Sequence, residues 1–180
     1  MRAVSCTALP WMAQPDAMVD IRLFEDADWP EVWRIVAPVF RAGRTYAVAT
    51  DISAQAARAM WVDTPTATYV VRDGEGQLVG TYFLQANKPG PGDHVANCGY
   101  IVDPEARGQG VATAMCRHSQ ERAVALGFRA MQYNLVVATN EQAVALWQRE
   151  GFAIVGTLPG AFCDPDYGDV DAYVMFKTLV

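Results

Sequence analysis

The stretch CGYIVDPEARGQGVATAMCRHSQERAVAL, residues 98–126, decides the fold that we predict for this chain. It begins with an apolar run rich in residues that favour strands, and Asp103-Pro104 ends that run because proline cannot donate to a sheet ladder. After a segment with two glycines, small and apolar residues recur with the spacing of one helix face. That face consists of Ala112, Met115, Cys116, Ser119, Ala123 and Leu126. The stretch therefore predicts a strand, a glycine turn and a helix.

The predicted start of this helix lacks a capping side chain. No Ser, Thr, Asp or Asn lies between Arg107 and Ala112, although the first amides of a helix need an acceptor. Gly108 and Gly110 carry no side chain that would keep an anion away, and the helix dipole favours negative charge there. Two interpretations stay open from these residues. The amides bind a phosphate, with Arg107 adding a charge-assisted contact, or they bind water in an ordinary turn.

The spacing of the turn differs from that of the common phosphate loops. It has neither the Gly-Lys-Ser/Thr of a P-loop nor the third glycine of the dinucleotide fingerprint. RGQGVA at residues 107–112 instead resembles the acetyl-CoA pyrophosphate loop of the GNAT N-acetyltransferase superfamily, Gln/Arg-x-x-Gly-x-Gly/Ala. NEQAVALWQREGF at residues 140–152 resembles the second motif of that superfamily, Asn-x-x-Ala-x-x-Leu-Tyr-x-x-x-Gly-Phe. The two motifs stand in the order that the superfamily has.

The composition predicts one globular domain. The chain has 180 residues, 52% of them hydrophobic, which is enough for a sizeable core. A net charge of −6 without a basic cluster argues against a nucleic-acid partner, and the apolar runs are too short to cross a membrane. Residues 1–19 contain Pro10 and Pro15 but no continuous apolar core. We interpret them as an N-terminal extension, with Met18 as an alternative natural start, and expect the domain to span residues 20–180.

The four cysteines do not have the spacing of metal ligands. We interpret Cys6, Cys98, Cys116 and Cys163 as reduced thiols. Because reduced thiols persist in the cytoplasm, we expect a cytoplasmic protein, and we expect no bound metal.

Alternation, helix periodicity and turn residues predict the order of the elements. They are a strand at 20–25, helices at 29–42 and 53–61, strands at 68–72, 77–85 and 94–102, a helix from the glycine turn to 127, a strand at 130–137, a helix at 139–150, and strands at 152–157 and 171–177. We expect Pro38 to end or kink the first helix, Ser53 to cap the second, Thr139 with Gln142 to cap the last, and residues 159–170 to form a loop.

This order of elements is that of the GNAT fold. The resemblance implies an α/β fold (an α+β sandwich) with a mixed central sheet of about seven strands and flanking helices. It also implies that strands 94–102 and 130–137 splay apart beside the glycine turn. The co-substrate implied is acetyl-CoA, whose pantetheine arm lies between these strands, and a backbone amide near Gly99 or Tyr100 serves as the oxyanion donor. The acetyl-CoA-binding residues implied are Ile101, Val102, Arg107, Gly108, Gln109, Gly110, Val111, Ala112, Thr113 and Asn140.

Two asparagines are candidate catalytic residues. Asn97 and Asn134 each lie within an apolar strand, where a buried amide costs free energy unless it is hydrogen-bonded. An asparagine within a strand commonly forms a hydrogen bond to main chain at a bulge. Here two asparagines converge on one gap, which favours a functional role for both. NCGYIV at residues 97–102, together with Asn134 and Trp147, resembles the fungal azetidine-2-carboxylate acetyltransferases, which act on proline-like imino acids. That resemblance implies that the two asparagines handle the acceptor.

For the general acid and base the sequence offers several candidates. Trp147 stands where the superfamily often has a tyrosine that protonates the leaving thiolate, and tryptophan cannot do this in the same way. Solvent, Tyr133 or Tyr173 are the alternatives. Strand 94–102 carries no carboxylate, so we prefer an ordered water as the base. The weaker candidates are His94, Asp169 and Asp171.

The sequence thus predicts an acetyl-CoA-dependent N-acetyltransferase that acts on a small-molecule amine, including amino acids and proline-like imino acids. One alternative is an acyl-CoA-binding module without chemistry, suggested by Trp147, and another is an enzyme of antibiotic or amino-acid-analogue resistance. Arg44 either binds a substrate carboxylate or is an ordinary solvated arginine. We expect a small amine as the partner, leave a homodimer open, and expect neither nucleic acid nor a membrane.

Overall fold

The computed structural model describes residues 19–180, so Cys6 and Met18 lie outside the described residues. The strands are β1 (Asp20–Leu23), β2 (Ala67–Arg72), β3 (Leu78–Ala86), β4 (Val95–Val102), β5 (Ala130–Val137), β6 (Ala153–Asp164) and β7 (Gly168–Thr178). The helices are α1 (Trp29–Ala42), α2 (Ala54–Arg58), α3 (Val111–Ala125) and α4 (Glu141–Arg149). A turn of π-helix at Ala59–Asp63 follows α2 directly.

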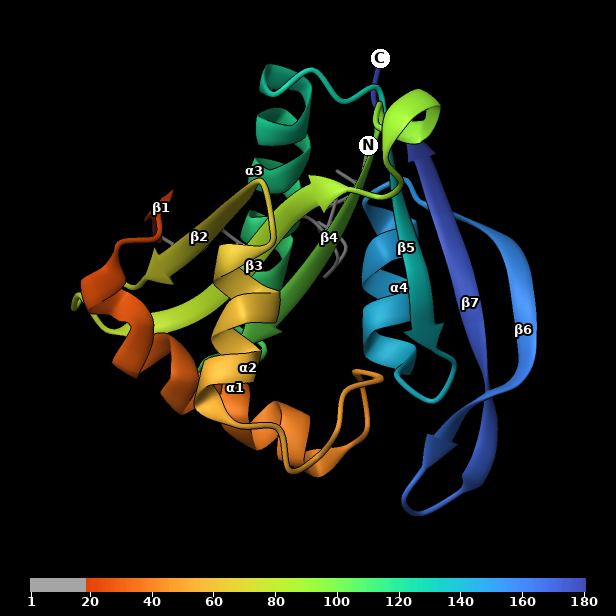
Figure 1. Ribbon diagram of the computed structural model, residues 1–180, viewed down its shortest axis with the longest axis horizontal. Helices are drawn as coiled ribbons and strands as arrows, with labels where there is room; N and C mark the ends of the chain where they lie inside the picture. The colour runs from red at the N-terminus through yellow and green to blue at the C-terminus, as the bar shows by residue number, and fades with distance from the viewer. Residues whose placement is uncertain (1–18) are drawn as a thin grey trace, which may run out of the picture.

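The strands of the described part form one seven-stranded sheet in the order β1-β2-β3-β4-β5-β7-β6 (Figure 1). β4 and β5 are parallel, and the other neighbouring pairs are antiparallel. This mixed sheet with four flanking helices confirms the predicted α/β fold.

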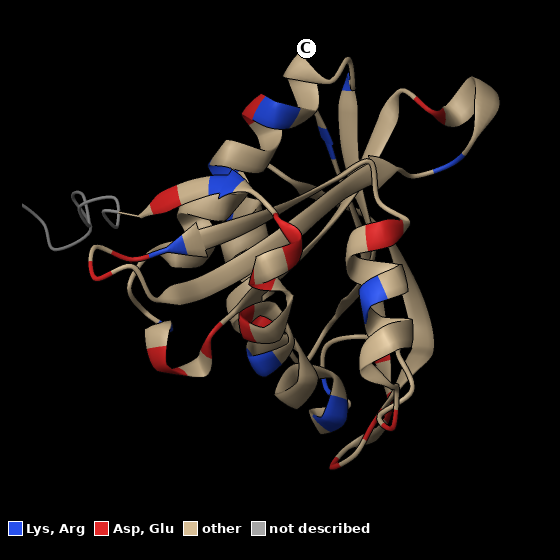
Figure 2. Ribbon diagram, turned by 60° about the vertical axis from the view of Figure 1, so that its left-hand side comes forward, with Lys and Arg blue, Asp and Glu red and all other residues tan. Residues whose placement is uncertain are grey.

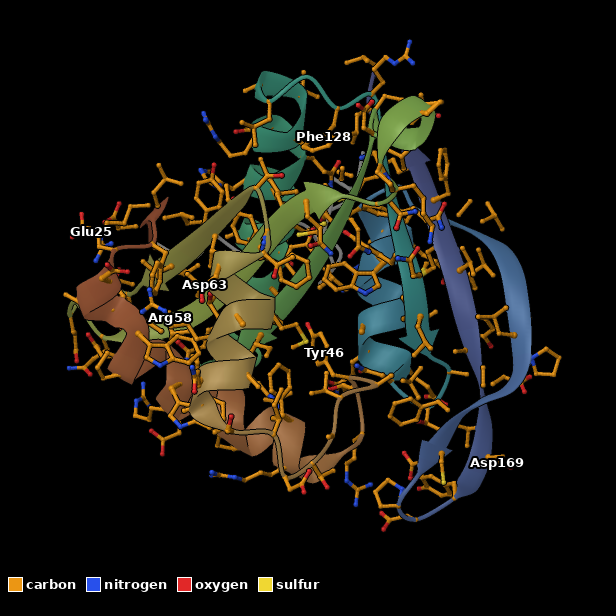
Figure 3. All side chains as sticks on the ribbon, in the orientation of Figure 1. Glu25, Tyr46, Arg58, Asp63, Phe128 and Asp169 are labelled. Atoms are coloured by element: carbon orange, nitrogen blue, oxygen red, sulfur yellow. The ribbon has the colours of Figure 1, made fainter. Side chains whose placement is uncertain are left out.

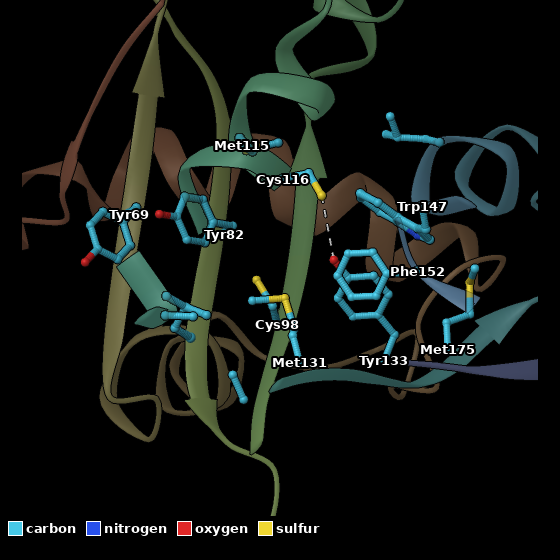
Figure 4. Packing of buried hydrophobic residues seen from close by; sticks show 14 of the residues in the cluster. Tyr69, Tyr82, Cys98, Met115, Cys116, Met131, Tyr133, Trp147, Phe152 and Met175 are labelled. Atoms are coloured by element: carbon cyan, nitrogen blue, oxygen red, sulfur yellow. Dashed lines mark hydrogen bonds between the residues drawn. The ribbon is translucent and has the colours of Figure 1, made fainter. Parts of the chain in front are cut away.

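The helices cover the two faces of the sheet in pairs. Alternate residues of β3 and β4 point to opposite faces, so Phe83 and Ile101 pack in the core beneath α1 and α2. Tyr82, on the opposite face of β3, packs in a second core with residues of α3 and α4 such as Met115 and Trp147 (Figure 4). The sheet therefore separates two hydrophobic cores.

The helices on the first face begin as predicted. The side chain of Ser53 caps α2 by accepting from the amide of Ala56 at 3.2 Å, as expected. The expectation that Pro38 would end or kink α1 is wrong in so far as the helix continues to Ala42. Pro38 lies on the exposed side of α1, where water can bind the carbonyl of Arg34 that loses its helical donor.

The C-terminal strands differ most from the prediction. Residues 159–170, which we expected to form a loop, belong largely to a long hairpin in which β6 and β7 pair as far as Asp164 and Gly168. A register shift between Leu158 and Phe162 accommodates the irregular residues around Pro159 without ending the strand. The hairpin extends beyond the rest of the sheet towards the loop between α1 and α2 (Figure 1).

β4 and β5 pair only at their beginnings. The ladder within residues 19–180 consists of Val95 with Ala130 and Ala96 with Met131, after which the two strands diverge (Figure 1). The predicted splay is thus confirmed, and we call the space between the diverging strands the seam. The beginning of α3 lies at the end of β4, so the seam runs towards the glycine turn.

Candidate active site

The open edge of β4 presents a fixed set of main-chain groups to the seam. The amide of Asp103 donates to Val79 of β3 at 2.9 Å, and the carbonyl of Val95 accepts from Asn87 at 2.8 Å. In an antiparallel ladder alternate residues point their main-chain groups to the same neighbour. The odd-numbered residues of β4 therefore bind β3, and Cys98, Tyr100 and Val102 face the seam.

This alternation corrects one expectation and narrows another. Ile101 pairs with Thr81 of β3, so its main-chain groups are not available to the seam, whereas those of Val102 are. The amide of Gly99 likewise points to β3 and cannot be the oxyanion donor, which leaves the amide of Tyr100. The sequence places these groups within one residue but does not fix the register, which depends on where β3 pairs.

The glycine turn has the backbone that an anion site needs. Gly108 and Gly110 have φ angles of 76° and 84°, in the left-handed region that favours glycine. Gly110 precedes α3, and none of the described side chains caps the helix there, as the sequence predicted. Asp103 anchors the turn, because it accepts from the amide of Glu105 at 3.1 Å and pairs with Arg34 of α1 at 2.7 Å. The first amides of α3 thus point to an open, rigid turn.

A cavity of about 1000 Å³ joins the turn to the seam. The predicted acetyl-CoA-binding residues line this cavity, except Gln109. The side chain of Gln109 instead donates to the carbonyl of Glu105 at 3.2 Å. β3, β4 and β5 carry no charged residue, and these strands are uniformly tan in Figure 2. Glu141 of α4 is the one carboxylate among the lining residues. The centre of the seam is therefore uncharged.

The cap of α4 differs from the prediction. Asn140, not Thr139, is the N-cap residue, and its side-chain oxygen accepts from the amide of Ala143 at 3.4 Å. The expected capping box of Thr139 and Gln142 is therefore wrong, since the helix begins at Glu141, one residue after Asn140. Asn140 still lines the cavity, and a ligand contact would use its amide NH₂ group.

Asn97 and Asn134 both line the cavity, but they are not buried in the way that the sequence suggested. Asn97 is half-buried and donates across the seam to the carbonyl of Gln132 at 3.0 Å. Asn134 is exposed at an irregularity of β5; it donates to Asn87 at 2.7 Å and accepts from the Gln132 side chain at 2.8 Å. Gln85 adds a longer contact of 3.4 Å to Asn97. We call these five side chains the amide cluster.

Trp147 packs in the core and also lines the cavity. Only 8% of it is exposed, and its ring centroid lies 4.9 Å from that of Tyr100. The centroid of Tyr133 lies 5.2 Å away, and the rings of Trp147 and Tyr133 are both labelled in Figure 4. Tyr133 lies among the residues that line the cavity, whereas Tyr173 does not. Of the two tyrosines considered as proton donors, Tyr133 is thus the one in position.

Burial keeps the polar groups of this core neutral. It raises the pKa values of Tyr100 and Tyr133 well above the ordinary value, and it raises that of Cys116 to about 11. The hydroxyls of Tyr100 and Tyr133 lie 3.0 Å apart, and that of Tyr100 lies 2.7 Å from Ser119. Tyr133 therefore reaches the cavity as a phenol and not as a phenolate.

The other acid–base candidates lie away from the cavity. His94, Asp169 and Asp171 do not line it. Asp171 accepts from the amide of Gly160 at 2.9 Å, and Figure 3 shows Asp169 on the projecting β6–β7 hairpin. Arg44 does not line the cavity, and its half-exposed side chain pairs with Asp166 of that hairpin at 2.6 Å. This pair ties the hairpin to the loop between α1 and α2.

One residue of the site was missed by the sequence analysis. Tyr46 donates to the carbonyl of Tyr100 at 2.8 Å and lines the cavity (Figure 3). The available signal was Gly99, since a glycine within a strand marks a close approach. A Cβ atom at Gly99 would lie 2.6 Å from the ring of Phe83 and 3.3 Å from the hydroxyl of Tyr46.

Among residues 19–180 we find no group of side chains arranged to hold a metal ion. Within the same range no helix is long and apolar enough to span a membrane.

These features define a class of protein in which two parallel strands, here β4 and β5, diverge next to the uncapped start of a helix, here α3. The chain belongs to the acetyltransferase (GNAT) family, whose model matches residues 29–152. It is 32% identical over 103 residues to the N-acetyltransferase aca1 of Schizosaccharomyces pombe, a match covering 57% of this chain and 49% of that protein. The matched region thus spans about half the length of this curated relative.

Solved structures agree with this assignment. A GCN5-related N-acetyltransferase from Kribbella flavida is 40% identical, with a TM-score of 0.85 over 89% of this chain and 97% of that chain. A phosphinothricin acetyltransferase from Sinorhizobium meliloti, in complex with AcCoA, has a TM-score of 0.78 at 22% identity over 89% of this chain and 88% of its own. At that identity the second structure shows a shared fold.

Proposed function

We propose that this protein is an acetyl-CoA-dependent N-acetyltransferase that acts on the amine of a small molecule, with amino acids and proline-like imino acids as the first candidates. The observation that carries the proposal is the seam. One wall offers the main chain of Cys98, Tyr100 and Val102, and the seam leads to the uncapped start of α3. Membership of the GNAT family supports the same activity.

The residues of the turn fit a pyrophosphate. The left-handed glycines leave space in front of the first α3 amides, which would bind phosphate oxygens together with the helix dipole, and Arg107 is exposed beside them. The main chain of Val102 would pair with the pantetheine arm, and the amide of Tyr100 would bind the thioester oxygen. Acetyl-CoA supplies the acetyl group as an activated thioester.

The amide cluster would hold the acceptor. Asn97 and Asn134 combine donors and acceptors without titrating, which suits a zwitterionic amino or imino acid. Because the central strands carry no charged side chain, we assign the proton of the amine to an ordered water. The leaving thiolate would take its proton from solvent or from Tyr133, and Trp147 would serve the core alone.

The decisive experiment follows thiol release from acetyl-CoA with a panel of amines that includes proline, azetidine-2-carboxylate and phosphinothricin. Thiol release that depends on the amine supports the proposal. Tight acetyl-CoA binding without thiol release from any amine would instead support a binding module. Phosphinothricin tests the alternative of a resistance enzyme, because one structure with the same fold is a phosphinothricin acetyltransferase.

Two smaller parts of the proposal have separate tests. A cytoplasmic location is supported by Cys98, Cys116 and Cys163, which are free thiols, two of them buried. Fractionation of cells checks it. A homodimer stays a prediction, and the mass of the protein in solution decides it.

A further inference from the structure

A second cavity opens on the other face of the sheet, between the α2 segment and β3. Its volume is about 530 Å³, and its walls include Tyr46, Ala59, Met60, Trp61, Phe83 and Gln85. Tyr46 and Phe83 also line the cavity of the seam, so the two spaces adjoin. We call the second space the aromatic pocket.

The aromatic pocket has an apolar and uncharged wall. None of its lining residues is Asp, Glu, Lys, Arg or His. The indole N–H of Trp61 is directed away, because it donates to Thr81 at 3.1 Å. Edge-to-face contacts with Tyr46 at 5.6 Å and Phe83 at 4.9 Å between centroids hold the Trp61 ring in place. Such a wall favours an apolar group and penalises a charged one.

Tyr46 marks the junction of the aromatic pocket with the seam. Its hydroxyl donates to the carbonyl of Tyr100, a group that faces the seam. Burial raises the pKa of Tyr46, so the hydroxyl stays protonated and keeps lone pairs free to accept from an amine. Gly99 makes this junction open, because a side chain there would collide with Phe83.

Gln85 joins the pocket to the amide cluster. It lies on β3 opposite Asn97 and donates to it at 3.4 Å. Moving from the seam, an acceptor would thus meet polar amides first and then the aromatic wall. The order of these groups matches a molecule whose amine and polar end lie at the seam while an apolar substituent points away.

We propose that the aromatic pocket binds the apolar substituent of the acceptor. The acceptor class is then an amine or amino acid with an aliphatic or aromatic group, and not one with a second charge on that group. This inference rests on the proposed acetyl transfer. It assigns a binding place to the apolar substituent of the acceptor, whereas the amide cluster accounts only for the polar end.

The test compares acceptors that differ in one substituent. One series is glycine, leucine, phenylalanine and glutamate, and a parallel series is ethylamine, isoamylamine, phenethylamine and putrescine. We expect kcat/KM to rise about tenfold or more from the smallest member to the apolar ones, since one buried methylene contributes roughly a fourfold gain. The charged members should not exceed the smallest one.

Substitutions link the preference to this pocket. Ala59→Trp should fill the space and lower the leucine-to-glycine or isoamylamine-to-ethylamine ratio about tenfold. The matched control is Gln55→Trp, which adds the same ring to an exposed position of α2 outside the pocket and should leave the ratio unchanged. Met60→Ala should shift the preference towards the larger aromatic members.

The outcomes separate this inference from the activity itself. If thiol is released but the ratios are flat, or if Ala59→Trp and Gln55→Trp behave alike, the pocket assignment is overturned while acetyl transfer stands. If the protein binds acetyl-CoA but releases thiol only with proline, azetidine-2-carboxylate or phosphinothricin, the pocket assignment is overturned while acetyl transfer stands. If it releases thiol with none of these and with no member of either series, both proposals fail. A preference for glutamate or putrescine would also overturn the assignment.

Discussion

The glycine turn differs in construction from the side chains of the seam to which we assign the acceptor, here called the acceptor side. The turn is one continuous stretch, residues 103–113, in which each functional group lies within a few residues of the next. The acceptor side combines Tyr46 from a loop, Gln85 from β3, Asn97 from β4 and Asn134 from β5. The first works through backbone conformation, and the second works through side chains brought together by the sheet.

The difference affects what each region tolerates. A helix terminus binds an anion with amides that any residue has, provided that glycine permits the conformation. The acceptor side has no such generic group, so its chemistry depends on individual side chains. Changes at the turn should therefore abolish the binding of acetyl-CoA, and changes at the acceptor side should alter selectivity and rate.

The largest effect on binding is expected at the turn. Gly110→Val introduces a β-branched side chain at a φ of 84° and fills the space before the α3 amides. We expect acetyl-CoA affinity to fall by at least about a hundredfold, or ~3 kcal/mol, as measured by calorimetry. Gly127→Val is the control, because Gly127 has a φ of 92° near the opposite end of α3. Unchanged affinity in Gly110→Val would show that the turn does not bind acetyl-CoA.

The asparagines should show the reverse pattern. Asn97→Ala and Asn134→Ala each remove an amide from the acceptor side, and we expect about ten- to hundredfold losses in kcat/KM for the acceptor, with acetyl-CoA affinity nearly constant. Because Asn97 also ties β4 to the carbonyl of Gln132, its loss should lower the melting temperature more than that of exposed Asn134. Gln148→Ala, an exposed amide of α4 outside the cavity, is the control.

Two outcomes for these variants would contradict the comparison. Poor acetyl-CoA binding would show that the asparagines bind acetyl-CoA and not the acceptor. Normal kinetics with a lower melting temperature would make them structural groups of the sheet.

A smaller effect on catalysis is expected at Trp147. Because this residue packs against Tyr100 and Tyr133, Trp147→Phe should keep activity within about threefold while lowering the free energy of unfolding by roughly 1–3 kcal/mol. Rates at saturating substrates and urea unfolding measure the two effects. A fall of kcat by several orders of magnitude in a folded variant would assign Trp147 a chemical role. Tyr133→Phe then tests whether the nearby phenol is the proton donor.

No effect on catalysis is expected at Asp28, which lies apart from both regions. Burial alone would raise its pKa, but hydrogen bonds from Arg22, the Glu25 amide and Arg72 outweigh it and lower the pKa to about 2 from 3.8. The carboxylate should thus contribute roughly 2 kcal/mol of stability above about pH 4, and lose it as the pH falls through about 2. Urea unfolding across this pH range measures that loss.

Asp28→Asn should be less stable at neutral pH and should lose this acid dependence, with unchanged acetyl-CoA affinity. Asp26→Asn is the matched control, since the side chain of Asp26 is 87% exposed and its pair with Arg58 should contribute little. Equal acid sensitivity of wild type and Asp28→Asn would contradict the assignment.

The sequence predicted which helices and strands form more accurately than it predicted where they end and what they contact. The bounds of α1 and β5 agree with the prediction, because periodicity and the flanking turn residues coincide there. The hairpin at residues 159–170 was missed because two prolines and two glycines usually end strands, and only the pairing of β6 with β7 overrides them. Thr139 was assigned as the cap of α4 in place of Asn140, because both residues satisfy the same local pattern.

The sequence by itself determined the strand, the glycine turn and the uncapped helix, since these depend on residues that are neighbours along the chain. It also placed Asn97 and Asn134 each within a strand, and the resemblance to the GNAT fold implied that these two strands adjoin. Only the tertiary structure decided that the main-chain groups of Tyr100, and not those of Gly99, face the seam, because the register of β4 is set by β3. Only the tertiary structure placed Tyr46 against the carbonyl of Tyr100, 54 positions further along the chain. Such contacts arise when layers pack, and no local pattern encodes them.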